Sequence, residues 1–101
     1  MVVFNTTFSI DKDIHQEFMD FLLESFIPLA MESGILTLPR LSKIVSHGED
    51  EGVSLALEFQ AEDFDALEDW QNNESADVFS RLIDAFGDKV VGFSTFMEVI
   101  S

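Results

Sequence analysis

The chain has 101 residues, the usual length of one small domain, and 47% of them are hydrophobic, which is enough to build a core. Its 20 acidic and 5 basic residues leave a formal net charge of −15, so nucleic acid and membrane surfaces are excluded as expected partners, because both are anionic. The absence of cysteine excludes disulfides, thiolate catalysis and cysteine-bound zinc.

In the N-terminal third, apolar and polar residues first alternate, and apolar residues then recur at helical spacing. Residues 2–10 predict a strand with an apolar face for the core and a small, polar face opposite. The polar face comprises Val3, Asn5, Thr7 and Ser9. Helical spacing of apolar residues then runs from Ile14, with Asp11 as the expected N-cap, a bend at Pro28 and an end at Gly34.

Residues 36–61 predict two strands joined by a glycine- and acid-rich turn at 48–52. Pro39 cannot donate to a ladder, so the first strand, 36–47, is expected at a sheet edge with a bulge near 39–42. The second strand, 53–60, has the clearest alternation in the chain. It directs Leu55, Leu57 and Phe59 to one face and Glu58 to the other.

The last forty residues predict two helices and a strand. The helices run over 62–73 and 74–86, with an interruption at residues 72–73 and Gly87 as the cap of the second. For the final strand, 89–100, we expect the odd-numbered residues from Val91 to Val99 on the core face. Ser94 and Phe96 are then expected on the polar face.

The order strand, helix, strand, strand, helix, strand predicts the ferredoxin-like βαββαβ sandwich of the α+β class. Right-handed crossovers place both helices on one face of a four-stranded antiparallel sheet. We expect the strand order 4-1-3-2 or its equivalent, with the first and fourth or the first and third strands in the centre. We expect one such domain over residues 1–101. The second sheet face is too apolar for a solvated surface and too polar for a dry core, so we expect a homodimer through this face, with a cavity between the sheets.

Four runs carry a family resemblance: FNTTFSID (4–11), IPLAMESGILTLPRLSKI (27–44), GVSLALEF (52–59) and FGDKVVGFST (86–95). Together they resemble a bacterial domain family of unknown function that is similar to the dimeric α+β barrel group of ferredoxin-like proteins. The resemblance implies the fold and dimerisation. The wider group includes cofactor-free and heme-dependent monooxygenases, small-ligand binders and enzymes acting on polyketides or muconolactone. None of their catalytic motifs matches here residue by residue.

Six residues are candidates for lining a ligand pocket at the sheet face. They are Asn5, Thr7, Arg40, Glu58, Ser94 and Phe96. Glu58 could act there as a general base, or Arg40 could pair with it in a structural role. His47 beside the acids at 49–51 could hold a cation, but consecutive turn residues point apart, so no metal site is expected. No catalytic residue and no cofactor are assigned.

The expected function is therefore that of a homodimer that binds a small ligand or a partner at its sheet face. The alternative is a small cofactor-independent enzyme, monooxygenase-like or isomerase-like, that uses the barrel cavity. The sequence leaves open whether the protein is an enzyme. It has neither a basic, apolar leader nor a run of about 18 apolar residues, so we expect a cytoplasmic location.

Overall fold

The structure is a computed structural model that describes residues 1–45 and 52–101. The predicted cation candidates at 47–51 and most of the turn at 48–52 lie outside this part of the chain. The described strands and helices, in chain order, are β1 (Val2–Asp11), α1 (His15–Phe21), α2 (Ile27–Ala30), β2 (Thr37–Lys43), β3 (Gly52–Ala61), α3 (Phe64–Asn73), α4 (Ser75–Phe86) and β4 (Val90–Glu98).

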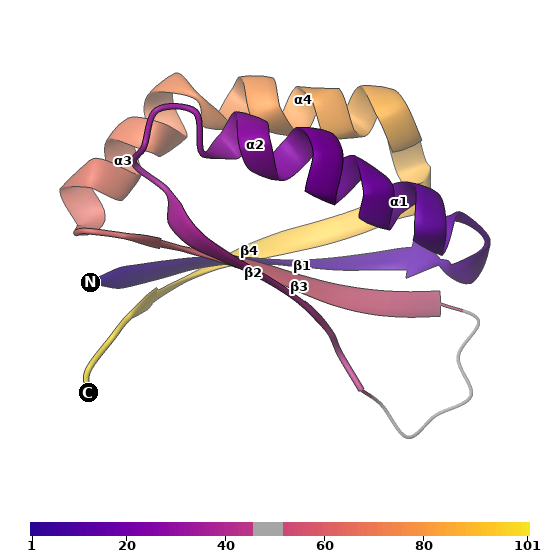
Figure 1. Ribbon diagram of the computed structural model, residues 1–101, viewed down its shortest axis with the longest axis horizontal. Helices are drawn as coiled ribbons and strands as arrows, with labels where there is room; N and C mark the ends of the chain where they lie inside the picture. Colours follow the sequence, from indigo (N-terminus) through magenta and orange to yellow (C-terminus); the bar gives the residue numbers. More distant parts are fainter. Residues whose placement is uncertain (46–51) are drawn as a thin grey trace.

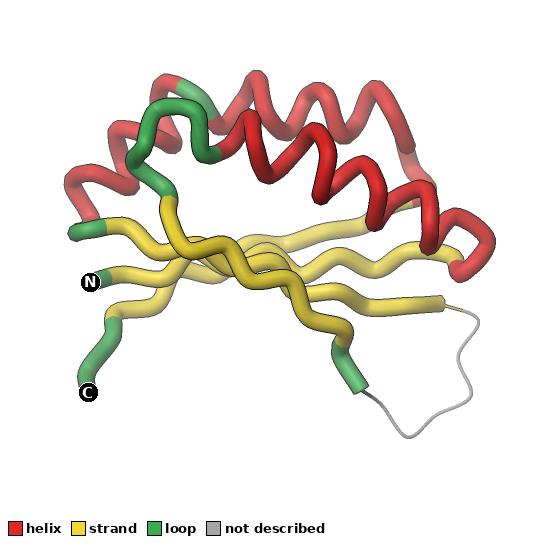
Figure 2. The backbone as a smooth tube through the Cα atoms, in the orientation of Figure 1, coloured by secondary structure: helices red, strands yellow, loops and turns green. Residues whose placement is uncertain are grey.

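The four strands form one antiparallel sheet in the order β2-β3-β1-β4. This is the predicted order 4-1-3-2 read from the opposite edge, with β1 and β3 in the centre. All helices lie on one face of the sheet, and no described element covers the other face (Figures 1 and 2). The α+β sandwich predicted from the element order is therefore confirmed.

The core lies between the helices and the sheet. The even-numbered side chains of β1 and the odd-numbered side chains of β3 face it, as the alternation predicted. The helices contribute large apolar side chains that are fully or nearly fully buried. These are Ile14, Phe18, Leu22, Phe26, Leu67, Trp70, Val78 and Leu82. Each such side chain adds roughly 1.5–3 kcal/mol on burial, so the two layers are held together mainly by this contact.

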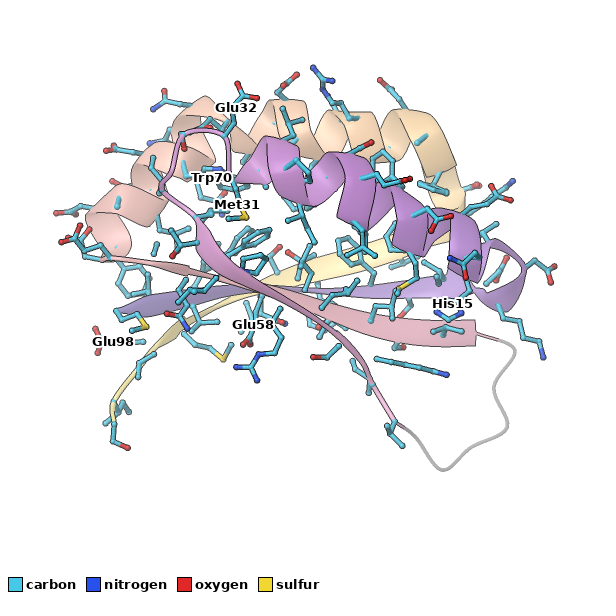
Figure 3. All side chains as sticks on the ribbon, viewed as in Figure 1. His15, Met31, Glu32, Glu58, Trp70 and Glu98 are labelled. Carbon is cyan, nitrogen blue, oxygen red and sulfur yellow. The ribbon has the colours of Figure 1, made fainter. Side chains whose placement is uncertain are left out.

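Trp70 joins three elements of the core. Its side chain is 0% exposed and its ring centroid is 5.4 Å from that of Phe4 on β1. Its indole Nε1–H donates a 2.9 Å hydrogen bond to the carbonyl oxygen of Ala30. Ala30 is the last residue of α2, where carbonyls lack an intrahelical partner, so this bond satisfies a helix end inside the core. Figure 3 shows Trp70 between the helices and the sheet.

The first helical stretch departs from a regular α-helix in the way that Pro28 dictates. A π-helical segment, Leu22–Phe26, separates α1 from α2, and Pro28 lies at the start of α2. Proline has no N–H and its ring crowds the carbonyl four residues earlier, and a wider turn relieves both conflicts. Asp11 occupies the expected N-cap position, at the start of a short 3-10 turn (Lys12–Ile14) that leads into α1, but its side chain makes no capping bond. The helix also ends before Gly34, which instead occupies a turn with φ 83°.

Strand β2 lies at the sheet edge, as Pro39 predicted. Its pairing with β3 shifts register between Thr37 and Arg40, and Leu38 within this segment has φ 51°. The irregularity at Leu38 and Pro39 therefore begins one residue before the predicted bulge at 39–42 and overlaps it. Beyond it the pairing is regular and places Arg40 directly opposite Glu58.

The two side-chain faces of strand β4 are exchanged relative to the prediction. Its pairing with β1 sets Ser94 opposite Thr6 and Phe96 opposite Phe4, and both β1 residues face the helices. Residues directly opposite each other on neighbouring strands share a sheet face. The odd-numbered residues, Val91 to Met97, therefore lie on the open face, not in the core. Sequence alternation could not decide this because β4 is an edge strand with apolar residues on both faces.

Candidate functional site

Four of the six predicted site residues share the open sheet face. The Nδ2 of Asn5 donates a 3.1 Å hydrogen bond to the Thr7 hydroxyl. The Nη2 of Arg40 lies 3.1 Å from the Oε1 of Glu58, which occupies the next strand. Figure 3 shows Glu58 on the side of the sheet away from the helices. The ion pair that the sequence offered as the structural role of Glu58 is thus present, and it joins the edge strand β2 to β3.

Ser94 and Phe96 lie on the opposite, helix-covered face. The expected convergence of all six residues at one pocket is therefore wrong. The reason is that successive side chains of a strand point to opposite faces of the sheet. The faces of β4 are exchanged relative to the prediction, so both residues lie on the other face. They border a different cavity from the one predicted.

That cavity is a cleft of about 560 Å³ between α4 and the β1–β4 half of the sheet, which we call the α4–β4 cleft. It is lined by Phe4, Thr6, Phe8, Gln71, Ser75, Ala76, Phe79, Leu82, Ile83, Val90, Gly92, Phe93, Ser94 and Phe96. The two small residues Gly92 and Ser94 leave this space open. A Cβ at Gly92 would lie 3.1 Å from the Phe8 ring, so a larger residue there would crowd the cleft wall.

The inner part of the cleft combines an aromatic stack with a pair of hydroxyls. The rings of Phe4 and Phe96 are stacked, with centroids 5.3 Å apart and planes inclined by 11°. Phe96 as a whole residue is 45% exposed, so part of it remains accessible to a ligand. Beside the stack, the Thr6 Oγ1 and Ser94 Oγ are 3.0 Å apart, and either hydroxyl can donate to the other.

The described lining of the cleft contains no ionisable side chain. Its polar atoms come from hydroxyls, the Gln71 amide and the backbone. Sequence reasoning named Ser94 and Phe96 but missed Thr6, Phe79 and Ile83. Thr6 offered a signal, because it is a hydroxyl at an otherwise apolar alternation position. Phe79 and Ile83 offered none, since helical apolar residues of this kind usually belong to the core.

Other features of the described chain are weaker candidates. A second hollow of about 560 Å³ near Met1 and Gly34 has no aromatic residue in its lining. Within residues 1–45 and 52–101, no group of three or more His, Asp or Glu side chains could hold a metal ion. None of the helices in these ranges is long and apolar enough to cross a membrane.

The open sheet face has an apolar edge formed by β4. Val91 is 67% exposed, Phe93 62% and Met97 41%, although all three are large apolar residues. Towards the sheet centre the face is made of small and amide side chains from β1 and β3. Acidic residues are nearly absent from its described strand positions: Asp11 lies at the end of β1, and Glu58 is paired with Arg40.

The protein has two layers, the element order βαββαβ and the strand order β2-β3-β1-β4. These features together define a ferredoxin-like α+β protein. A comparison with family models matches residues 1–100 to a domain of unknown function, DUF4286. The chain belongs to this family. A comparison with curated proteins finds no match.

Solved structures share the fold at low sequence identity. An EthD family protein from Bacillus halodurans has a TM-score of 0.72 and 18% identity, covering 99% of this chain and 100% of that one. An antibiotic biosynthesis monooxygenase has a TM-score of 0.63 and 14% identity, with both chains fully covered. A dimeric ferredoxin-like protein from an uncultured marine organism has a TM-score of 0.67 and 15% identity, covering 99% and 96%.

Proposed function

We propose that this protein is a homodimer that binds a small molecule in the α4–β4 cleft of each protomer. The observation that carries the binding role is the cleft itself. Its volume of about 560 Å³ falls within the range of roughly 300–1,000 Å³ that is typical of ligand pockets. Its apolar and aromatic lining, with a few convergent polar groups, is also the usual composition of such pockets.

The distribution of charge supports dimerisation through the open sheet face. Two copies of a chain with a net charge of −15 repel each other, so they can associate only through a surface from which acids are largely excluded. The open face meets this condition, and its exposed Val91, Phe93 and Met97 would be removed from water by a second copy. The fold is also that of a protein described as dimeric.

Binding is better supported than catalysis. An enzyme that moves protons needs an ionisable side chain within reach of the reacting atoms. The described lining of the cleft has none, and Glu58 lies on the other sheet face in a pair with Arg40. The fold shared with an antibiotic biosynthesis monooxygenase keeps a cofactor-independent enzyme as the second candidate.

The binding role is tested by filling the cleft from its rim. Ala76 is exposed on α4 and lines the cleft, so Ala76→Trp places a large ring in its mouth at little cost in stability. The matched control is Ala85→Trp, at an exposed alanine of the same helix outside the lining. A thermal-shift screen first identifies compounds that stabilise the wild-type protein.

We expect these compounds to stabilise Ala85→Trp as they do the wild type and to lose at least about tenfold in affinity for Ala76→Trp, or about 1.4 kcal/mol. Isothermal titration calorimetry on both variants measures this difference. Compounds that bind equally well to both variants would place their site outside the cleft and contradict the proposal.

Self-association has a separate test. Light scattering coupled to size exclusion should give the mass of two 11.4 kDa chains at micromolar concentration. Raising the salt concentration should strengthen the dimer, because salt screens the long-range repulsion between two acidic copies. A monomeric mass under all these conditions would refute this part of the proposal.

A further inference from the structure

We infer that the α4–β4 cleft selects flat, uncharged aromatic molecules and excludes anionic ones. This inference rests on the proposed binding role and names the class of ligand. It follows from three properties of the described lining: a stacked ring with one free face, a neighbouring hydroxyl pair, and an absence of charge.

The free face of Phe96 determines the shape of the ligand. Phe4 already covers the inner face of the Phe96 ring in a nearly parallel stack. A planar ligand can extend the same stack from the other side of the ring, because Phe96 as a whole residue is 45% exposed. Offset stacking of this kind is a favoured arrangement of aromatic rings and adds to the gain from burying apolar area.

The hydroxyl pair determines where a polar group of the ligand would lie. When one hydroxyl of the Thr6–Ser94 pair donates to the other, the accepting hydroxyl keeps its own O–H free. Thr6 is only 4% exposed, whereas Ser94 is exposed, so Ser94 offers its lone pairs to the cleft, and its O–H as well when Thr6 is the donor of the pair. A ligand with one N–H, hydroxyl or carbonyl group can therefore be oriented beside the stack.

The charges around the cleft determine which charged ligands are excluded. A charged ligand would find no counter-ion in the described lining and would lose hydration on entry. Another hollow shares Phe96 and Gln71 with the cleft and is lined by the acids Asp65 and Glu68. These carboxylates and the net charge of −15 add a repulsion that acts on anions alone.

Two fluorescent probes with the same ring system test the effect of ligand charge while the ring system is kept constant. N-phenyl-1-naphthylamine is neutral, and 8-anilinonaphthalene-1-sulfonate carries one sulfonate on the same anilinonaphthalene frame. Trp70 is the single tryptophan of the chain and contacts Phe4, which contacts Phe96. A neutral probe stacked on Phe96 should quench Trp70 emission by energy transfer, which reports its binding, and weaker binding to a Phe96 variant locates it in the cleft.

The expected result is that the neutral probe binds at least about tenfold more tightly than the sulfonate and quenches Trp70. Phe96→Leu and Ser94→Ala should each weaken it by about two- to tenfold, the range of one modest contact. The control Thr95→Ala removes a hydroxyl from the other face of the same strand and should have no effect.

The outcomes separate this inference from the proposed function. If both probes bind alike and both are lost in Ala76→Trp, the cleft binds ligands but the assigned ligand class is wrong. Tighter binding of the cationic dye thioflavin T than of the neutral probe would also overturn the class. If compounds from the screen and both probes bind Ala76→Trp as they bind Ala85→Trp, the proposed function fails together with the inference.

Discussion

Replacing Phe93 with glutamate should convert the protein from a dimer into a monomer at micromolar concentration. Phe93 is 62% exposed in the protomer, and its pairing with Thr7 places its side chain on the open face of β4, although the residue also borders the α4–β4 cleft. In a symmetric dimer through this face, each substitution is present twice. Two carboxylates would then enter a surface from which acids are nearly absent, and burying an unpaired charge is costly. We expect a loss of at least about 2 kcal/mol, which raises the dimer Kd about 30-fold.

The control for this result is Phe64→Glu. Phe64 is also an exposed phenylalanine, at 48%, but it begins α3 on the helical layer. A glutamate in the first turn of a helix is compatible with the helix dipole, so the protomer should fold normally. Analytical ultracentrifugation of both variants measures the Kd. A dimer that survives Phe93→Glu but is lost in Phe64→Glu would place the interface on the helical layer instead.

The largest loss of folding stability is expected at Trp70. Its ring is fully buried against Phe4, and its Nε1–H satisfies the Ala30 carbonyl at the end of α2. Trp70→Ala leaves a large cavity and an unpaired carbonyl, and should cost about 3–5 kcal/mol. Trp70→Phe keeps most of the apolar contact but loses the hydrogen bond, and should cost about 1–3 kcal/mol.

Urea unfolding followed by far-ultraviolet circular dichroism measures both costs, since the variants lack the only tryptophan as a fluorescent reporter. All proteins must be compared at one concentration, because dimerisation stabilises the folded chain. Phe64→Ala, at an exposed site on the same helix, should change the stability by about 0.5 kcal/mol or less. Equal losses in Trp70→Phe and Trp70→Ala would show that the hydrogen bond, rather than packing, dominates the contribution of Trp70.

Much of the fold follows from local patterns. The alternation in β1 and β3 predicted their core faces because one parity is apolar and the other is small or polar. Pro39 placed β2 at an edge because proline cannot donate to an internal ladder. Gly87 marked the end of α4, and its φ of 59° is a conformation that glycine adopts without strain.

The candidate site was harder to predict. Ser94 and Phe96 were predicted to lie on the open sheet face, but their pairing with Thr6 and Phe4 places them on the helix-covered face. Both parities of β4 carry apolar side chains, so its hydrophobic pattern is compatible with either orientation. Only the pairing of Thr6 with Ser94 across the sheet resolves this choice.

The amino-acid sequence by itself determined the order of the elements, the core faces of the central strands and a strongly acidic chain. These depend on period, turn residues and composition, which are local properties. Only the tertiary structure decided which face of β4 meets the helices, and therefore where the cleft lies and which apolar residues remain exposed. That choice depends on the register of β4 with β1, which sets the small residues Gly92 and Ser94 beneath α4, and this register is not a property of β4 alone.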